Sequence, residues 1–147
     1  RIAVWGLAFK PNTDDIREAP SLAVCRALLD AGAEVVAYDP VASGQVRRQH
    51  PALPIELADS AYGATHGAHA LVLVTEWSEF RTPDFHLLAQ QLQDRALFDG
   101  RNVYEPQSVA ARGLYYASIG RPTADGRAPA QQPPAQQAPA LSASTSR

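Results

Sequence analysis

Two cations and three carboxylates within one stretch make residues 6–18 the part of the sequence best suited to chemistry. The side chains of Lys10 and Arg17, together with backbone amides, suit a phosphate group. The carboxylates that could orient these cations are Asp14, Asp15 and Glu18. The stretch joins an apolar run to a helix and exceeds the ~2–6 residues of an ordinary connection of this kind, which favours a functional loop. A solvated loop that caps the helix is the alternative.

Two aspartates at the ends of later apolar runs define two further candidate positions. Asp39 precedes Pro40, so it either bonds ribose hydroxyls, as in a dinucleotide-binding unit, or makes an ordinary turn. Because the sequence lacks the G-x-G-x-x-G fingerprint, the turn is favoured. Asp99 is followed by Gly100 and Arg101, and a planar guanidinium there suits phosphate or sugar oxygens. A simple turn is again the alternative.

Metal binding and nucleophilic catalysis find little support in the sequence. His66 and His69 have helical spacing. The nearby carboxylates, Asp59 and Glu76, do not complete a recognisable ligand set around them. Cys25, the single cysteine, falls on the apolar side of an expected helix and is interpreted as a buried, unreactive thiol. We therefore expect no metal site and no catalytic residue in this segment.

Apolar runs alternate with helical patterns along residues 1–120, and this alternation predicts the fold. The expected strands are Ile2–Trp5, Glu34–Tyr38, Ile55–Leu57, Ala70–Val74, Ala96–Phe98 and Leu114–Ile119. The expected helices run from Pro20 to a stop at Gly32 and over about 42–50, 60–68, 84–92 and 106–112. Strands separated by helices imply right-handed crossovers and a mostly parallel sheet. We therefore predict a Rossmann-like, doubly wound α/β domain, which binds ligands beyond the carboxyl ends of its strands.

Composition divides the chain into a folded part and a tail. We place the domain at residues 1–120 and expect residues 121–147, rich in Pro, Ala, Gln and Ser, to be disordered because they cannot bury enough apolar surface. The net charge of −2 does not favour nucleic-acid binding, and no apolar run reaches the ~18–20 residues of a membrane span. One cysteine suits a reducing compartment such as the cytoplasm. The start at Arg1, in place of Met, leads us to expect a segment of a longer protein.

Several motifs in a fixed order resemble the C-terminal domain of the UDP-glucose/GDP-mannose dehydrogenase family. They are AVWGLAFKPNTDDIREAP at 3–20, AYDP at 37–40, TEWSEF at 75–80, FDGRN at 98–102 and YASIGRP at 116–122. The resemblance covers about residues 1–122. Within the family it is strongest to the bacterial UDP-glucose 6-dehydrogenases.

This resemblance implies a function for the domain and for four of its residues. Enzymes of the family oxidise a nucleotide sugar to a carboxylate with two NAD⁺, and UDP-glucose becomes UDP-glucuronate in this way. Their C-terminal domain binds the UDP part of the substrate, and the full-length enzymes form dimers. By motif position, Phe9 and Lys10 line the nucleotide-sugar site and Arg101 bonds the sugar. Arg17 reaches toward NAD, which an N-terminal domain mainly holds.

The segment departs from the family in lacking the catalytic cysteine motif and the NAD-binding glycines. Cys25 does not match the catalytic position, so we expect the segment alone to be inactive. Three alternatives remain open: a domain of a sister enzyme for GDP-mannose or a UDP-N-acetylamino sugar, a non-catalytic nucleotide-binding module, and an independent NAD-binding domain. The missing G-x-G-x-x-G disfavours the last of these.

Overall fold

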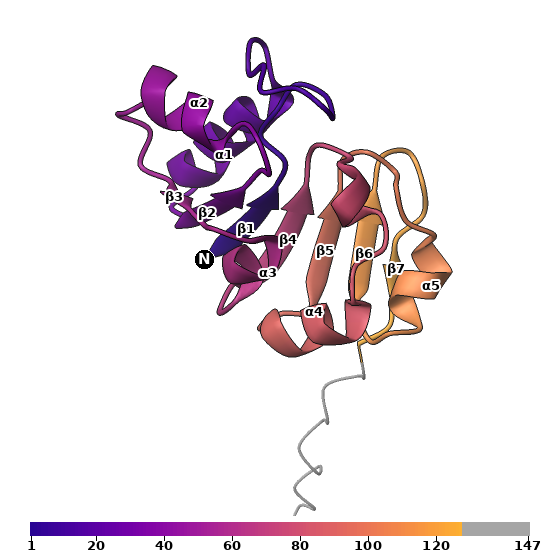
Figure 1. The fold of residues 1–147 in the computed structure, drawn as a ribbon. Coiled ribbons are helices and arrows are strands. Elements are labelled where there is room, and N and C mark those ends of the chain that lie inside the picture. Colours follow the sequence, from indigo (N-terminus) through magenta and orange to yellow (C-terminus); the bar gives the residue numbers. More distant parts are fainter. Residues whose placement is uncertain (128–147) are drawn as a thin grey trace, which may run out of the picture.

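A seven-stranded sheet flanked by helices organises the computed structural model, which describes residues 1–127 (Figure 1). Its strands are β1 (Ile2–Trp5), β2 (Val35–Tyr38), β3 (Glu56–Leu57), β4 (Ala70–Leu73), β5 (Ala96–Asp99), β6 (Tyr115–Ser118) and β7 (Ala124–Asp125). They are arranged in the order β3-β2-β1-β4-β5-β6-β7, and only the β6–β7 pair is antiparallel. The predicted Rossmann-like α/β fold is confirmed.

The helices cover both faces of the sheet. They are α1 (Pro20–Asp30), α2 (Ser43–Gln49), α3 (Ala61–Thr65), the 3₁₀ turn η1 (Ser78–Phe80), α4 (Phe85–Gln91) and α5 (Pro106–Ala110). From β1 the sheet grows first toward β2 and β3 and then, in the opposite direction, toward β4 and β5. Since the crossovers are right-handed, α1 and α2 lie on one face and α3 and α4 on the other. The strand order therefore reverses between β1 and β4, where ligands of such sheets bind.

Local sequence signals explain where the helices begin and end. The first turn of α1 contains Pro20, whose missing N–H has no partner there anyway, and the chain leaves the helix through Gly32 at φ +90°. Asp84 caps α4 by accepting a hydrogen bond from a backbone N–H of its first turn. Helix α3 ends at Thr65, earlier than the expected 60–68, because His66 already takes an extended ψ of 118°, and Gly67 at φ +71° then directs the chain toward β4.

The sheet continues past the domain boundary that we expected at Gly120. Strand β7 places Ala124 opposite Tyr116 and Asp125 opposite Tyr115 of β6, and the Ala124 side chain is buried. The sequence around β7 is polar and short of β-branched residues, so local propensity did not indicate it. The remainder of the expected disordered tail, residues 128–147, lies outside the described residues.

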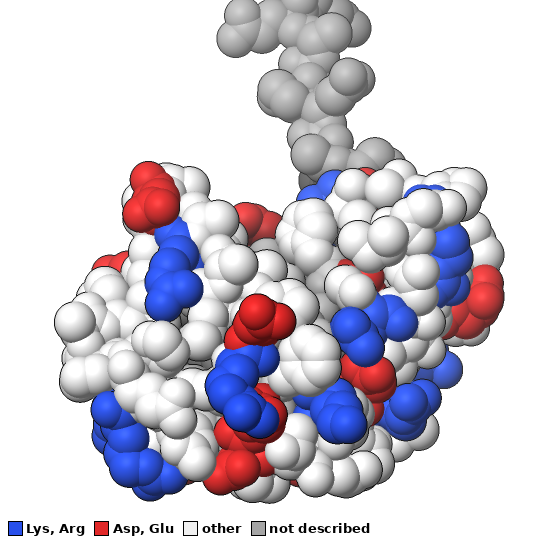
Figure 2. Space-filling view, turned by 90° about the horizontal axis from the view of Figure 1, so that it is seen from above, with Lys and Arg blue, Asp and Glu red and all other residues white. Residues whose placement is uncertain are grey.

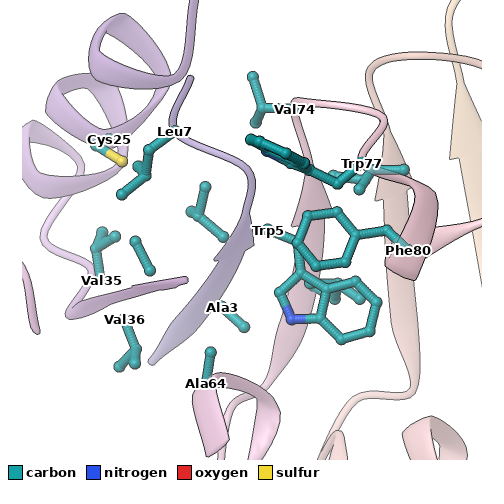
Figure 3. Packing of buried hydrophobic residues seen from close by; sticks show 14 of the residues in the cluster. Ala3, Trp5, Leu7, Cys25, Val35, Val36, Ala64, Val74, Trp77 and Phe80 are labelled. Carbon is teal, nitrogen blue, oxygen red and sulfur yellow. The ribbon is translucent and has the colours of Figure 1, made fainter. Parts of the chain in front are cut away.

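A continuous apolar core holds β1 in the middle of the domain (Figure 3). On one side of β1, the rings of Trp5 and Phe80 stack with their centroids 5.0 Å apart. On the other side, Leu7 and Cys25 pack between β1 and α1, and both are fully buried. Close packing on both sides fixes the carboxyl end of β1, and with it the start of the loop that follows.

Candidate functional site

The carboxyl ends of β1, β4 and β5 open onto one edge of the sheet, which Figure 2 shows from above. The loop over residues 6–18, indigo in Figure 1, stands over this edge. Basic and acidic side chains are interspersed across the face, so no broad patch of one sign covers it (Figure 2). Binding at this edge must therefore depend on particular side chains and their partners.

The first residues of this loop are anchored to neighbouring elements through their carbonyl groups. The hydroxyl of Thr75 donates a hydrogen bond of 2.7 Å to the carbonyl of Ala8. The hydroxyl of Ser21, at the start of α1, donates one of 2.7 Å to the carbonyl of Leu7. Gly6 has a φ of +94°, and a side chain there would lie 2.4 Å from the Cβ of Thr75. Glycine is therefore required where the loop leaves β1.

A buried carboxylate, that of Asp39, holds the same residues through their amides. Its Oδ2 accepts hydrogen bonds from the backbone N–H groups of Leu7 and Ala8, at 2.7 and 2.9 Å, and from the indole N–H of Trp77 at 2.9 Å. Its Oδ1 closes the local turn by accepting the N–H of Ala42 at 2.7 Å. Asp39 is 2% exposed, so it faces these donors and not a ribose at the surface. The turn that we favoured for Asp39 is present, and the residue also joins three loops.

The amides at the start of the loop are consequently not available to a phosphate. Leu7 and Ala8 donate to Asp39, and the N–H of Phe9 donates to the carbonyl of Asp15 at 2.8 Å. Our expectation that backbone amides of this loop suit a phosphate is therefore wrong for these three residues. The pyrophosphate site of an ordinary dinucleotide-binding turn is closed here, which argues against an independent NAD-binding domain.

The side chains of Phe9 and Lys10 lie free at the surface of the loop. The Phe9 side chain is 49% exposed, which is unusual for a large apolar ring. Lys10 is exposed and makes no hydrogen bond or ion pair with any of residues 1–127. The bond from Phe9 N–H to Asp15 closes the loop around them. The structure thus leaves an exposed ring and an ammonium without an ion pair on two consecutive residues of the loop.

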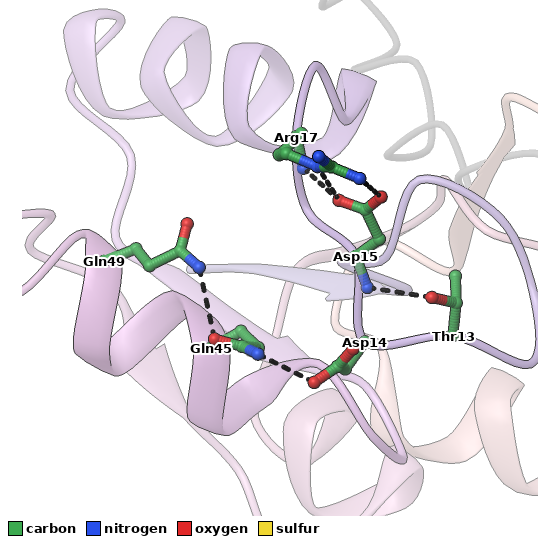
Figure 4. Close-up of polar contacts among 6 residues, drawn as sticks. All are labelled: Thr13, Asp14, Asp15, Arg17, Gln45 and Gln49. Atoms are coloured by element: carbon green, nitrogen blue, oxygen red, sulfur yellow. Dashed lines mark hydrogen bonds and ion pairs between the residues drawn. The ribbon is translucent and has the colours of Figure 1, made fainter.

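Arg17 is oriented by one of the carboxylates that we expected to do so (Figure 4). Asp15 accepts its Nε–H at 3.0 Å and its Nη2–H at 2.7 Å, and this pairing lowers the pKa of the partly exposed Asp15 carboxyl to about 2. Asp14 instead accepts a hydrogen bond of 2.7 Å from Gln45 of α2. The loop therefore leans toward α2, on the side of β1 opposite to β4 and β5. Arg17 stands on that side, away from Arg101.

Arg101 lies just past the end of β5 and pairs with a residue that the sequence did not single out for this purpose. Glu76, just past the end of β4, accepts its Nε–H at 2.6 Å and its Nη2–H at 2.9 Å. The hydrogen bonds lower the pKa of the Glu76 carboxyl below its ordinary value and raise that of Arg101. The backbone N–H of Arg101 donates to Asp99 at 2.9 Å. The order of the strands does not indicate that Arg101 pairs with Glu76, so only the structure identifies Glu76 as its partner.

Asp99 has the same role at β5 that Asp39 has at β2. It is 1% exposed, and its Oδ2 accepts the backbone N–H of Val103 at 2.7 Å and the hydroxyl of Tyr116 at 2.7 Å. Burial, followed by the hydrogen bond to Asp99, raises the pKa of Tyr116 to about 12. Asp99 is therefore a structural residue that fixes the turn carrying Arg101.

Cys25 and the possible metal ligands are the other candidates for chemistry in the described part of the chain. The buried position expected for Cys25 is confirmed, and desolvation raises the pKa of its thiol to about 11. Residues 1–127 contain no cluster of three or more His, Cys, Asp or Glu side chains arranged to hold a metal ion. None of the helices in that range is long and apolar enough to cross a membrane.

Comparisons with known proteins agree with this arrangement. Residues 3–106 match the model of the UDP-glucose/GDP-mannose dehydrogenase family, UDP binding domain. The chain is 50% identical over 127 residues to the UDP-glucose 6-dehydrogenase of Pseudomonas aeruginosa, covering 84% of this chain and 28% of that enzyme. It is 48% identical over 122 residues to the UDP-glucose 6-dehydrogenase of Rhizobium meliloti, covering 83% of this chain and 28% of that enzyme.

The solved structures include an NDP-N-acetyl-D-galactosaminuronic acid dehydrogenase from Methanosarcina mazei. It matches with a TM-score of 0.70 and 28% identity, over 85% of this chain and 25% of that one. The chain thus spans about a quarter of the length of the relatives that it matches. The sequence, the fold and the loops where the strand order reverses all agree. The chain belongs to the UDP-glucose/GDP-mannose dehydrogenase family, as its UDP binding domain.

Proposed function

We propose that this chain is the UDP-sugar-binding C-terminal domain of a UDP-glucose 6-dehydrogenase, which oxidises UDP-glucose to UDP-glucuronate with two NAD⁺. The observation that carries the proposal is the 50% identity, over 84% of this chain, to the enzyme of that name from Pseudomonas aeruginosa. The geometry supports it, because the segments that follow the two strands on either side of β4 each carry a cationic residue. One stands on the loop after β1 and the other on the turn after β5.

Three side chains divide the recognition of the substrate in this proposal. Lys10, whose ammonium has no partner among the described residues, binds the diphosphate. Phe9 offers an exposed ring to an apolar face of the nucleotide sugar. Arg101 donates hydrogen bonds to the hydroxyls of the sugar.

NAD and the catalytic groups belong to other parts of the enzyme under this proposal. The residues of this chain fit one contact to NAD and not a complete dinucleotide site, because the amides of Leu7 and Ala8 are held by Asp39. The contact comes from Arg17, which keeps three N–H donors beyond the two that Asp15 accepts. The nucleophile lies outside the segment, so the segment alone has no activity. The complete enzyme acts in the cytoplasm as a homodimer.

A sister enzyme for GDP-mannose or a UDP-N-acetylamino sugar is the second candidate. Its support is the likeness to the Methanosarcina enzyme, an NDP-N-acetyl-D-galactosaminuronic acid dehydrogenase. The identity to that protein is 28%, against 50% to the Pseudomonas enzyme, so UDP-glucose is favoured. A non-catalytic nucleotide-binding module is the third candidate, and it predicts binding without any sugar preference.

Calorimetric titration of the purified chain with UDP-glucose, UDP, GDP-mannose and NAD⁺ tests the proposal. We expect UDP-glucose and UDP to bind and GDP-mannose and NAD⁺ not to bind. Binding of GDP-mannose alone would assign the chain to the sister enzyme. Binding of NAD⁺ alone would make it a cofactor domain, and binding of none by a chain with the circular dichroism of a folded α/β domain would contradict the proposal.

A further inference from the structure

The ion pair between Glu76 and Arg101 determines which hydrogen-bond donors Arg101 can offer to a ligand. A guanidinium has five N–H donors. Two of them, the Nε–H and one on Nη2, donate to the two carboxylate oxygens of Glu76 at 2.6 and 2.9 Å. The other three are free of Glu76, and the Arg101 side chain remains 38% exposed. The pair therefore presents the three remaining N–H donors of Arg101 beside a carboxylate whose other lone pairs can accept a hydrogen bond from a hydroxyl.

Glu76 is held in place by residues on both sides of it. Thr75 is 1% exposed and donates its hydroxyl to the carbonyl of Ala8. Trp77 is 6% exposed and donates its indole N–H to Asp39. A residue between two such anchors has little freedom to change the direction of its side chain. Glu76 is consequently a fixed carboxylate and not a mobile surface one.

The turn that carries Arg101 is held as firmly. The N–H of Gly100 donates to the carbonyl of Leu73 at 2.9 Å, and a Cβ on Gly100 would lie 3.0 Å from that same oxygen. This close approach brings the turn after β5 against the end of β4. Asn102, at φ +55°, exchanges two hydrogen bonds of 2.9 Å with the backbone of Ile119. The backbone is therefore fixed at both residues, and it holds the carboxylate of Glu76 and the guanidinium of Arg101 in position to pair.

The pairing also changes the net charge that Arg101 presents. An arginine beside an ionised carboxylate forms a neutral pair, whose attraction for a diphosphate is much weaker than that of a free cation. Lys10, by contrast, makes no ion pair within residues 1–127, and Asp15, the carboxylate whose pKa its charge helps to lower, is itself paired with Arg17. Hydroxyls, which both donate and accept, match the mixed edge of the pair better than phosphate oxygens, which only accept and would be repelled by Glu76.

We propose that Glu76 is a positioning and specificity residue, which holds Arg101 for the hydroxyls of the sugar and keeps it off the diphosphate. The inference rests on the proposed function. It adds that Lys10 binds the diphosphate, whereas the Glu76–Arg101 pair binds the sugar. Glu76 acts through Arg101. Its removal should therefore affect ligands with a sugar and spare those without one.

The test compares UDP-glucose with UDP in calorimetric titrations of the 147-residue chain. Glu76→Gln keeps the shape of the side chain but removes its charge and one acceptor oxygen. We expect it to weaken UDP-glucose binding about tenfold, as for one hydrogen bond to a charged group, and to leave UDP binding within about twofold. Glu76→Asp keeps the charge on a shorter side chain, so we expect a smaller loss.

Two controls separate a positioning role from a structural one. Glu79→Gln makes the same charge change on η1, at an exposed residue, and should leave the preference for UDP-glucose over UDP unchanged. Arg101→Ala removes the guanidinium altogether, so adding Glu76→Gln to it should cause no further loss. Circular dichroism and thermal unfolding check that each variant is folded. If Glu76→Gln does not fold, the comparison is made with Glu76→Asp.

The outcomes distinguish the inference from the proposed function. An equal loss for UDP and UDP-glucose, or an unchanged preference in both Glu76 variants, would overturn the inference and leave the proposed function standing. An additive loss in the Glu76→Gln, Arg101→Ala double variant would show that Glu76 does not act through Arg101. If the unmodified chain bound neither UDP nor UDP-glucose, the proposed function would fail for this chain, and the inference with it.

Discussion

The indole N–H of Trp77 donates a hydrogen bond of 2.9 Å to the carboxylate of Asp39. This bond joins the segment after β4 to the turn after β2, and the loop after β1 lies between them in the sheet order. Because the same carboxylate oxygen also accepts the amides of Leu7 and Ala8, one buried group sets the relative positions of all three segments. The residues that face the ligand in our proposal, Phe9 and Lys10, follow immediately.

Replacement of Asp39 by asparagine should destabilise the domain. The amide is close to isosteric, but one acceptor oxygen becomes an NH₂ group that faces backbone or indole N–H donors in a buried site. At least one donor then loses its partner, and we expect the free energy of unfolding to fall by about 2–4 kcal/mol. Urea denaturation monitored by tryptophan fluorescence measures this. The control, Trp77→Phe, removes one donor and leaves the carboxylate intact, so a loss as large as that of Asp39→Asn would contradict the argument.

Gly6→Ala should be much more costly than Gly32→Ala, although both glycines have a positive φ. Gly6 has a φ of +94°, and its Cβ would lie 2.4 Å from the Cβ and 2.6 Å from the backbone nitrogen of Thr75. Gly32 has a φ of +90° with nothing within 4 Å of its Cβ, so only backbone strain of about 1 kcal/mol applies. We expect Gly6→Ala to cost at least about 3 kcal/mol, because backbone must move. Equal thermal shifts in the two variants would disprove the steric account.

The sequence predicts the central elements well because their signals are local. The apolar run Ile2–Trp5 and the Pro20 start of α1 are visible within a few residues, and both appear in the structure as expected. Strand β7 is missed because it depends on pairing with β6 and not on its own composition. The Glu76–Arg101 pair is missed for the same physical reason: its partners come from different strand exits and meet only in the folded sheet.

The hydrogen-bond partners of Asp39 show that much of the site forms only when distant segments of the chain meet in the folded domain. The Asp-Pro pair predicts a turn, and Oδ1 accepts backbone N–H groups of that turn. The donors on Oδ2 come from residues more than thirty positions away, and no periodicity indicates them. The candidate cations Lys10, Arg17 and Arg101 could be selected by residue type and motif. The sequence does not indicate which of them form ion pairs. Arg17 and Arg101 each pair with a carboxylate, whereas Lys10 makes no ion pair within the described residues.

The thiol of Cys25 should resist modification in the native domain. Cys25 is fully buried between α1 and β1, and desolvation raises its pKa to about 11, so very little thiolate exists at pH 8. We expect Ellman's reagent to react with one thiol per chain in urea and only very slowly without it. Rapid reaction of the native chain, with the fluorescence of the folded state retained, would contradict this expectation.

The Glu76–Arg101 pair should make stability depend on pH on the acid side. The folded-state pKa of Glu76 is lowered, chiefly by its hydrogen bonds to Arg101, so its contribution is fully present above the ordinary value of 4.5 and is lost as the pH falls through the folded value. The pair is partly exposed, so we expect a contribution of about 0.5–1 kcal/mol. Urea unfolding from pH 6 to pH 3 should show a shallower dependence for Glu76→Gln than for the unmodified chain. A parallel dependence in the two proteins would show that the pair does not contribute.

Arg101→Ala and Lys10→Ala should differ in the ligand that they affect. Removing Arg101 takes away hydrogen bonds from a charged donor to the sugar, so we expect UDP-glucose to bind more weakly by ~1.5–3 kcal/mol and UDP to bind nearly as before. Removing Lys10 takes away the unpaired cation, and both ligands should lose affinity to a similar extent. Arg112→Ala, at an exposed arginine after α5, is the matched control. Equal losses of UDP and UDP-glucose in Arg101→Ala would place that guanidinium on the diphosphate, because only a group that contacts the shared part of two ligands weakens both alike.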